Sequence, residues 1–278
     1  MAHVLEDLAR ECRRLGEISR LARGFGLSRR LGQHFMVSCR LAIEVATRLG
    51  DLCPGGDCLV YELGSGLGSL TLFLEKCSSY VVTSEIDPRF VEVLRRTFLG
   101  GPVDIVASDG IPLIRSLGEN FVVVSNTPYV VSSKVVVTVV KSAVRGAVLV
   151  LQDEVAKKLA AKPGDPNYGR ITAFTGTFME VELGGRYPPA SFRPKPRVWS
   201  TVVVLRRKRK WLEELGGYED FLRCLFNQRR RSLSKRLREC AGKDLEGIAP
   251  GLRVFSADPE FLFRLYMALR QGGERGSK

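Results

Sequence analysis

Short apolar runs separated by amphipathic segments occur throughout the first three quarters of the chain. Five of these runs lie at residues 58–63, 80–84, 103–107, 121–124 and 147–151. Continuous apolar runs of this length are typical of strands that are buried on both faces of a parallel sheet. Two further runs, at residues 178–183 and 200–205, are expected to form a closing pair of strands. The pattern predicts an α/β doubly wound sheet with an antiparallel edge.

Helical periodicity fills the segments between the strands. Residues 87–98 carry apolar side chains on one face, with Asp87 as the expected N-cap and Pro88 in the first turn. Residues 69–76 and 152–159 also favour helices. Strands that alternate with helices in this way support the parallel arrangement of the first five strands.

Two changes in composition divide the chain. Residues 1–30 predict a basic helical extension, and a basic run at residues 206–210 separates the sheet domain, residues 31–205, from residues 211–278. The last segment is helical in pattern only, which predicts a small all-helical domain. Its basic side chains could form a solvated face, but in a basic chain we expect them to contact RNA phosphates. These candidates are Arg229, Arg230, Arg231, Lys235 and Arg236.

Charge and cysteine content narrow the choice of partners. The 278 residues carry a formal net charge of +13, which favours a polyanion such as nucleic acid or an anionic membrane surface. No apolar run reaches the roughly 18 residues that a membrane span needs, and no signal-peptide pattern opens the chain. We therefore expect a cytoplasmic protein that does not enter the membrane. Seven cysteines without a Cys-x-x-Cys pair, and two histidines, predict buried free thiols with no metal site or disulfide framework.

A glycine-rich loop follows the first predicted strand. Gly64-Ser65-Gly66-Leu67-Gly68 comes directly after that strand, and the second strand ends at Glu85, 21 residues beyond Gly64. Glycines between a strand and a helix let the backbone approach a ligand, and an acid at this spacing suits the ribose hydroxyls of a nucleoside cofactor. Asp109, after the third strand, either accepts a hydrogen bond from an adenine amine or forms an Asp-Gly turn. The arrangement favours a nucleoside cofactor over a purely structural turn.

The fourth strand ends in Asn126-Thr127-Pro128-Tyr129. The Asn126 amide oxygen can accept a hydrogen bond from an exocyclic amine, and Pro128 shapes the turn so that nearby carbonyls can accept a second. Tyr129 offers a face on which a base can stack. An ordinary turn is the alternative, because Asn and Pro are common turn residues. Because the chain also carries the glycine loop, we interpret this motif as a site for a flat, amino-bearing ring.

Together these motifs resemble the KsgA family of small-subunit rRNA adenine dimethyltransferases, which use a Rossmann-like fold. The similarity covers nearly everything after Arg30, with the motifs in the order of the family. The matching segments lie at residues 32–35, 62–68, 85–87, 126–129, 152–156, 168–169, 192–198 and 225–231.

The resemblance implies transfer of two methyl groups from S-adenosylmethionine to the N6 amines of adjacent adenosines near the 3′ end of small-subunit rRNA. The expected partner is this rRNA within a pre-ribosomal small subunit, and the expected enzyme is a monomer without a metal. By similarity the cofactor pocket is bordered by Gln33, His34, Met36, Gly64, Gly66, Glu85, Ile86, Asp109 and Asn126. Catalytic placement of the target base is expected from Asn126, Pro128, Tyr129 and Phe192, with Tyr129 and Phe192 stacking on its two faces.

Four positions depart from the commoner family residues: His34, Met36, Ser65 and Thr127. The first two bear on the cofactor contacts, and none removes a group that the chemistry requires. Three alternatives stay open from the sequence. An Erm-type enzyme would methylate large-subunit rRNA, and a non-catalytic nucleic-acid-binding factor could share the fold. A nicotinamide dehydrogenase would explain the glycine loop but neither the Asn-x-Pro-Tyr loop nor the basic C-terminal domain.

Overall fold

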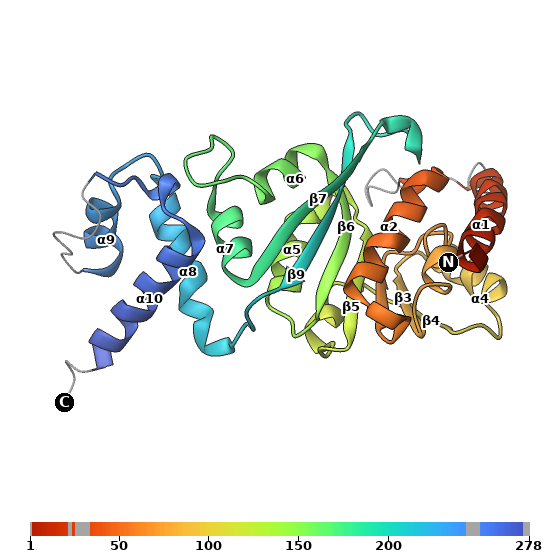
Figure 1. The fold of residues 1–278 in the computed structure, drawn as a ribbon, viewed down its shortest axis with the longest axis horizontal. Helices are drawn as coiled ribbons and strands as arrows, with labels where there is room; N and C mark the ends of the chain where they lie inside the picture. Colours follow the sequence, from red (N-terminus) through yellow and green to blue (C-terminus); the bar gives the residue numbers. More distant parts are fainter. Residues whose placement is uncertain (1, 22–23, 26–33, 243–250, 275–278) are drawn as a thin grey trace. The chain divides into compact units, whose positions relative to one another are not determined.

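A seven-stranded mixed sheet with the strand order β4-β3-β2-β5-β6-β9-β7 organises the structure (Figure 1). This computed structural model describes residues 2–21, 24–25, 34–242 and 251–274. Strands β2 to β6 pair in parallel, and β9 runs antiparallel to β6. The predicted α/β sheet with an antiparallel edge is therefore confirmed. The strands are β2 (Leu59–Leu63), β3 (Tyr80–Glu85), β4 (Val103–Ala107), β5 (Phe121–Asn126), β6 (Gly146–Gln152), β7 (Met179–Tyr187) and β9 (Ser200–Arg207).

Strand β2 marks the point where the order of the sheet reverses. It pairs with β3 on one side and with β5 on the other, so consecutive segments of the chain build outward in opposite directions. In open α/β sheets, ligands bind at this switch point, outside the carboxyl ends of the strands. The carboxyl ends of β2 and β5 carry the glycine loop and the Asn-x-Pro-Tyr loop, so the topology brings both motifs to one edge.

Helices connect the strands, and their starts follow from local sequence. Ser38 Oγ accepts a hydrogen bond from Leu41 N at 3.3 Å, and Asp87 Oδ1 accepts one from Arg89 N at 3.1 Å, as the predicted N-cap requires. Helix α3 (Thr71–Leu74) is shorter than the helix predicted at residues 69–76. Turns after glycines of positive φ, such as Gly68, occupy the first two of those residues. The helices of this part are α1 (Ala2–Leu21), α2 (Cys39–Leu52), α3 (Thr71–Leu74), α4 (Pro88–Thr97), α5 (Ser132–Val140) and α6 (Asp153–Leu159).

A second, two-stranded sheet was not predicted. Strand β1 (Phe35–Met36) pairs antiparallel with β8 (Phe192–Arg193), and Met36 lies opposite Phe192. Both side chains are only 1% exposed and belong to the main core. Strands of two residues leave no periodicity in the sequence, so only the three-dimensional structure reveals this pairing.

The chain divides into two compact units. The first comprises Met1–Ala156 and Glu182–Arg207, and the second comprises Lys157–Val181 and Lys208–Lys278. The boundaries expected from the sequence placed Lys157–Val181 in the sheet domain. The structure groups this segment with the C-terminal helices, because its helix packs on two of them through aromatic rings such as those of Phe178 and Tyr218. The helices of the second unit are α7 (Arg170–Phe178), α8 (Gly216–Phe226), α9 (Leu233–Ala241) and α10 (Pro259–Glu274).

The prediction of free thiols is wrong for six of the seven cysteines. The structure forms the disulfides Cys12–Cys39, Cys53–Cys58 and Cys224–Cys240, and it leaves Cys77 free. The first bond joins α1 to α2, where Leu15 and Ile18 of α1 are buried. The pairs Cys12–Cys39 and Cys224–Cys240 each join two helices, so they depend on helix packing, which cysteine spacing does not reveal. Among the described helices, none has the length and apolar character of a membrane span.

Candidate active site

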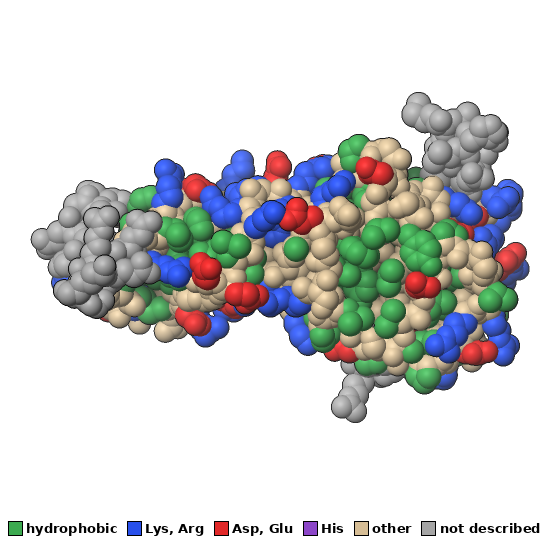
Figure 2. Space-filling model, turned by 90° about the horizontal axis from the view of Figure 1, so that it is seen from below, with side chains coloured by type: hydrophobic (Ala, Val, Ile, Leu, Met, Phe, Trp, Pro, Cys, Tyr) green, Lys and Arg blue, Asp and Glu red, His purple; other side chains and the backbone are tan. Residues whose placement is uncertain are grey.

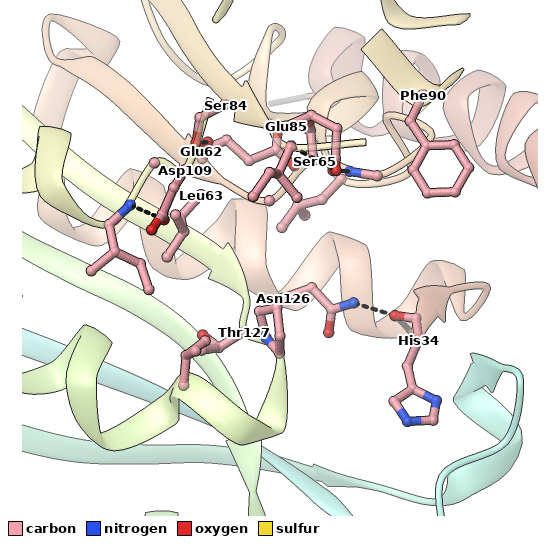
Figure 3. A pocket seen from close by; sticks show the side chains of 18 of the residues that line it. His34, Glu62, Leu63, Ser65, Ser84, Glu85, Phe90, Asp109, Asn126 and Thr127 are labelled. Carbon is pink, nitrogen blue, oxygen red and sulfur yellow. Dashed lines mark hydrogen bonds between the residues drawn. The ribbon is translucent and has the colours of Figure 1, made fainter. Parts of the chain in front are cut away.

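A cavity of about 330 Å³ opens at the carboxyl edge of the sheet, on the first unit. Its walls come from the loops that follow β2, β3, β4 and β5, together with β1 (Figure 3). A volume of this size is at the lower end of the range for small-molecule sites. The predicted nucleoside pocket and the predicted base-binding loop therefore border a single cavity.

The glycine loop forms one wall, and close packing explains its composition. Gly66 has a φ of +58°, a conformation that favours glycine. A Cβ at this position would lie 2.8 Å from the ring of Phe35 on β1. A side chain here would push the loop away from β1, and the cavity would change shape.

Glu85, at the end of β3, holds the opposite side of this loop. Its Oε2 accepts a hydrogen bond from Gly66 N at 2.7 Å, and its Oε1 accepts bonds from Ile86 N at 2.9 Å and Asp87 N at 2.8 Å. Burial raises the pKa of Glu85, and the bonds from the backbone act against that rise. Beside it, the apolar side chain of Ile86 is 57% exposed at the rim of the cavity. The Glu85 carboxylate suits the ribose of a nucleoside, and the aliphatic side chain of Ile86 suits its base.

Glu62 lies beneath the glycine loop, and the sequence reasoning did not single it out. Its Oε2 accepts a hydrogen bond from Thr71 Oγ1 at 2.6 Å, and the residue is 2% exposed. Burial raises the pKa of Glu62 to about 7. The available signal was an acidic residue inside an otherwise apolar strand, directly before the loop.

Asp109 lies at the wall of the cavity and forms the turn that was one of its two sequence interpretations, while its contact with an adenine amine stays a prediction. Its Oδ1 accepts a hydrogen bond from Ile111 N at 3.0 Å, which stabilises a turn, while the residue is exposed and lines the cavity. Tyr61 Oη donates to the Gly110 carbonyl at 2.9 Å, within the same turn. Asp109 is thus held at the cavity wall by its own loop.

Polar atoms without partners also line this cavity. Four of its hydroxyl oxygens are buried and have no hydrogen-bond partner within the described parts of the chain: Ser65 Oγ, Ser69 Oγ, Ser108 Oγ and Thr127 Oγ1. Buried hydroxyls normally have partners. Their concentration here fits a ligand with several polar groups, and the apolar wall that includes Phe90 fits an aromatic part of the same ligand.

The Asn-x-Pro-Tyr loop has a fixed geometry. Asn126 donates its Nδ2 hydrogen to the His34 carbonyl at 2.7 Å (Figure 3), and no described residue donates to its Oδ1. His34 is itself held by a hydrogen bond from Nδ1 to the Pro194 carbonyl at 2.7 Å. Tyr129 Oη and Ser200 Oγ are 2.8 Å apart, and burial raises the pKa of Tyr129, which stays neutral at physiological pH. The loop therefore presents one acceptor oxygen and one aromatic ring.

Most of the predicted pocket residues meet at the cavity. Its lining includes His34, Met36, Gly64, Gly66, Glu85, Ile86, Asp109, Asn126, Pro128 and Tyr129. Phe192 is not brought to the lining, since it is buried in the core opposite Met36, so this geometry does not support its expected stacking on the target base. Gln33 lies outside the described residues. Lys134, at the start of α5, also lines the cavity and was missed, because its helix had no distinct signal in the valine-rich run.

The basic residues predicted to contact RNA divide into two groups. Arg230, Arg231 and Lys235 are exposed. Arg229 instead donates to the Pro166 carbonyl at 2.9 Å, and Arg236 is 5% exposed and bonded to the Cys224 carbonyl. These two side chains hold backbone within the second unit. Lys and Arg side chains are also spread over other parts of the surface, with acidic side chains among them (Figure 2).

Comparisons with known proteins show what the chain is similar to. The sequence matches the family described as "Ribosomal RNA adenine dimethylase" over residues 24–249. A "Probable ribosomal RNA small subunit methyltransferase A" of Pyrococcus abyssi (strain GE5 / Orsay) is 33% identical over 254 residues, covering 87% of this chain and 91% of the relative.

Two solved structures share the fold. A dimethyladenosine transferase from Plasmodium falciparum is similar with a TM-score of 0.70 at 22% identity, over 83% of this chain and 96% of that one. The 23S rRNA methyltransferase ErmE is similar with a TM-score of 0.63 at 25% identity, over 85% of this chain and 100% of that one.

Proposed function

The chain belongs to the ribosomal RNA adenine dimethylase family, and we propose that it dimethylates the N6 amines of two adjacent adenosines near the 3′ end of small-subunit rRNA. The proposal places this reaction on a pre-ribosomal small subunit. The observation that carries it is the loop Asn126–Tyr129, whose acceptor oxygen and aromatic ring border the same cavity as the glycine loop and Glu85. The match to a "Probable ribosomal RNA small subunit methyltransferase A" over 87% of the chain supports the choice of subunit.

S-adenosylmethionine fits the cavity as the methyl donor. Glu85 would take the ribose hydroxyls, Ile86 would pack on the adenine ring, and Asp109 would accept from the adenine amine. The buried hydroxyls that lack partners would gain them from the polar groups of this cofactor. When bound, it supplies an electrophilic methyl group on a positively charged sulfur.

The protein's own contribution at the target is to position the amine. Adenine N6 is a weak nucleophile, because its lone pair is delocalised into the ring. A hydrogen bond from the amine to Asn126 Oδ1, and a second to a carbonyl near Pro128, would favour a pyramidal nitrogen with its lone pair directed into the cavity. Stacking on Tyr129 would offset the cost of removing the base from the RNA, at about 1–3 kcal/mol per base.

Methyl transfer to purified ribosomal subunits tests the proposal. Small and large subunits lacking the modification are incubated with the protein and labelled S-adenosylmethionine, and the label in each rRNA is counted. We expect label in small-subunit rRNA only. Label confined to the large subunit would instead support an Erm-type activity, which the likeness to ErmE makes the second candidate.

A further inference from the structure

An exposed tryptophan lies on the loop that enters β9. Trp199 is 41% exposed, and the guanidinium carbon of Arg186 lies 4.3 Å from the centre of its ring. Arg186 Nε is also 3.2 Å from the Asp153 carboxylate, so the guanidinium is held from two sides. A ring fixed in place by an arginine can present its exposed surface to a planar partner.

The position of this ring relates it to the target-base loop. Asp153 N donates to the Trp199 carbonyl at 2.9 Å, which fixes the backbone at the carboxyl end of β6. The next residue, Ser200, is hydrogen-bonded to Tyr129 at 2.8 Å. In the sheet, β9 lies two strands from β5, or about 10 Å at the usual strand spacing. Trp199 thus lies at the same edge as Asn126, within reach of an adjoining nucleotide.

Three basic residues precede the ring along the loop. Arg193, Lys195 and Arg197 are all exposed, and within the described residues none of them is within 4.0 Å of an acidic group. Unpaired cations beside an exposed aromatic ring are the combination that binds single-stranded nucleic acid, since bases stack while the phosphates are neutralised.

We propose that Trp199, held by Arg186, stacks on a nucleotide that flanks the target adenosine, and that Arg193, Lys195 and Arg197 neutralise the adjoining phosphates. The proposal rests on the proposed function and specifies how its RNA substrate is held. The flanking base would be fixed outside the cavity while the target base enters it. Because stacking accepts any base, the platform would contribute affinity more than sequence selectivity.

Steady-state methylation of small subunits by Trp199→Ala and Trp199→Phe tests the platform. We expect Trp199→Ala to lose about tenfold in kcat/KM, mainly through KM, and Trp199→Phe to retain most of it. Leu99→Ala is the matched control, because Leu99 is 88% exposed and lies before β4, away from the carboxyl edge; it should behave as wild type. Wild-type kinetics in Trp199→Ala, or equal losses in both Trp199 variants, would overturn the proposal.

Tryptophan fluorescence gives a second, direct measurement that does not depend on the alanine variant folding. The chain has two tryptophans, so Trp199→Phe leaves only Trp211. A single-stranded oligoadenylate should quench wild-type fluorescence and leave that of Trp199→Phe unchanged, and equal responses would overturn the proposal. Should wild type transfer no methyl to the small subunit, the proposed function fails, and the fluorescence experiment still decides whether Trp199 stacks on RNA.

Discussion

Asn126 and His34 are joined by a hydrogen bond of 2.7 Å that runs from the Asn126 side-chain amide to the His34 backbone carbonyl. The bond uses the donor end of the amide and leaves its oxygen as an acceptor at the cavity. The carbonyl belongs to the residue before β1, which pairs with β8. A segment distant in sequence therefore sets the orientation of the group that we assign to the target amine.

This hydrogen bond predicts that methyl transfer depends on both the oxygen and the nitrogen of the Asn126 side-chain amide. Asn126→Ala removes the acceptor, and we expect kcat for methyl transfer to fall by about 10²–10³-fold, as for the loss of one preorganised hydrogen-bonding group elsewhere. Asn126→Asp keeps an acceptor but cannot donate to the His34 carbonyl, so we expect a comparable loss. Single-turnover assays at saturating cofactor provide the measurement. Wild-type rates in either variant would refute the role of that end of the amide.

Tyr129 should act through its ring rather than its hydroxyl. Tyr129→Phe keeps the stacking face and loses only the contact with Ser200, so its KM for the RNA substrate should rise by no more than about tenfold. Ser200→Ala removes the same hydrogen bond and should match it. Tyr129→Ala should raise KM by about 5-fold to 100-fold, because stacking is lost. If Tyr129→Phe were as impaired as Tyr129→Ala, the hydroxyl would be the important group.

Glu62 predicts a pH dependence of stability. Its pKa rises from 4.5 to about 7 on folding, so the folded chain binds an extra proton between these values. The free energy of unfolding should therefore fall as pH rises from about 4.5 to 7, by about 3 kcal/mol in total, and then level off. Urea unfolding at pH 5 and pH 8, without cofactor, measures this change. Glu62→Gln does not titrate and should lose about 3 kcal/mol less than wild type, whereas equal losses would rule out Glu62 as the source.

The disulfides predict a specific labelling pattern. Unfolded without a reductant, the protein should react with a thiol-alkylating reagent at Cys77 alone, and after reduction at all seven cysteines. Mass spectrometry counts the labels. Cys224→Ser should also lower the stability of the second unit by about 3 kcal/mol, the usual effect for a bond that joins residues 16 apart. Seven labels before reduction would show that these bonds do not form.

Local patterns in the sequence were enough for much of the site. Gly66, Glu85 and Asn126 each follow a short apolar run, and parallel pairing necessarily brings the ends of neighbouring strands to one edge. The cap at Asp87 is also local, since its hydrogen bond joins residues only two positions apart. Such features can be predicted because both the element and its chemistry lie within one short segment.

Features that depend on contacts between distant segments could not be predicted from the sequence. Phe192 was assigned to the target base, but its pairing with Met36, 156 positions away, buries it in the core. Cys12 and Cys39 meet only because α1 packs on α2. Arg236 looked like part of a basic surface, yet its helix turns it inward. In each case the tertiary packing sets the position of the side chain, and sequence spacing alone does not distinguish the alternatives.

We propose that this chain converts two neighbouring adenosines of small-subunit rRNA to N6,N6-dimethyladenosine. Mass spectrometry of rRNA fragments from small subunits treated with the protein and S-adenosylmethionine tests it most directly. We expect a gain of four methyl groups on one fragment near the 3′ end, divided equally between two adjacent adenosines. An unmodified 3′ fragment, with cofactor demonstrably bound to the protein, would contradict it.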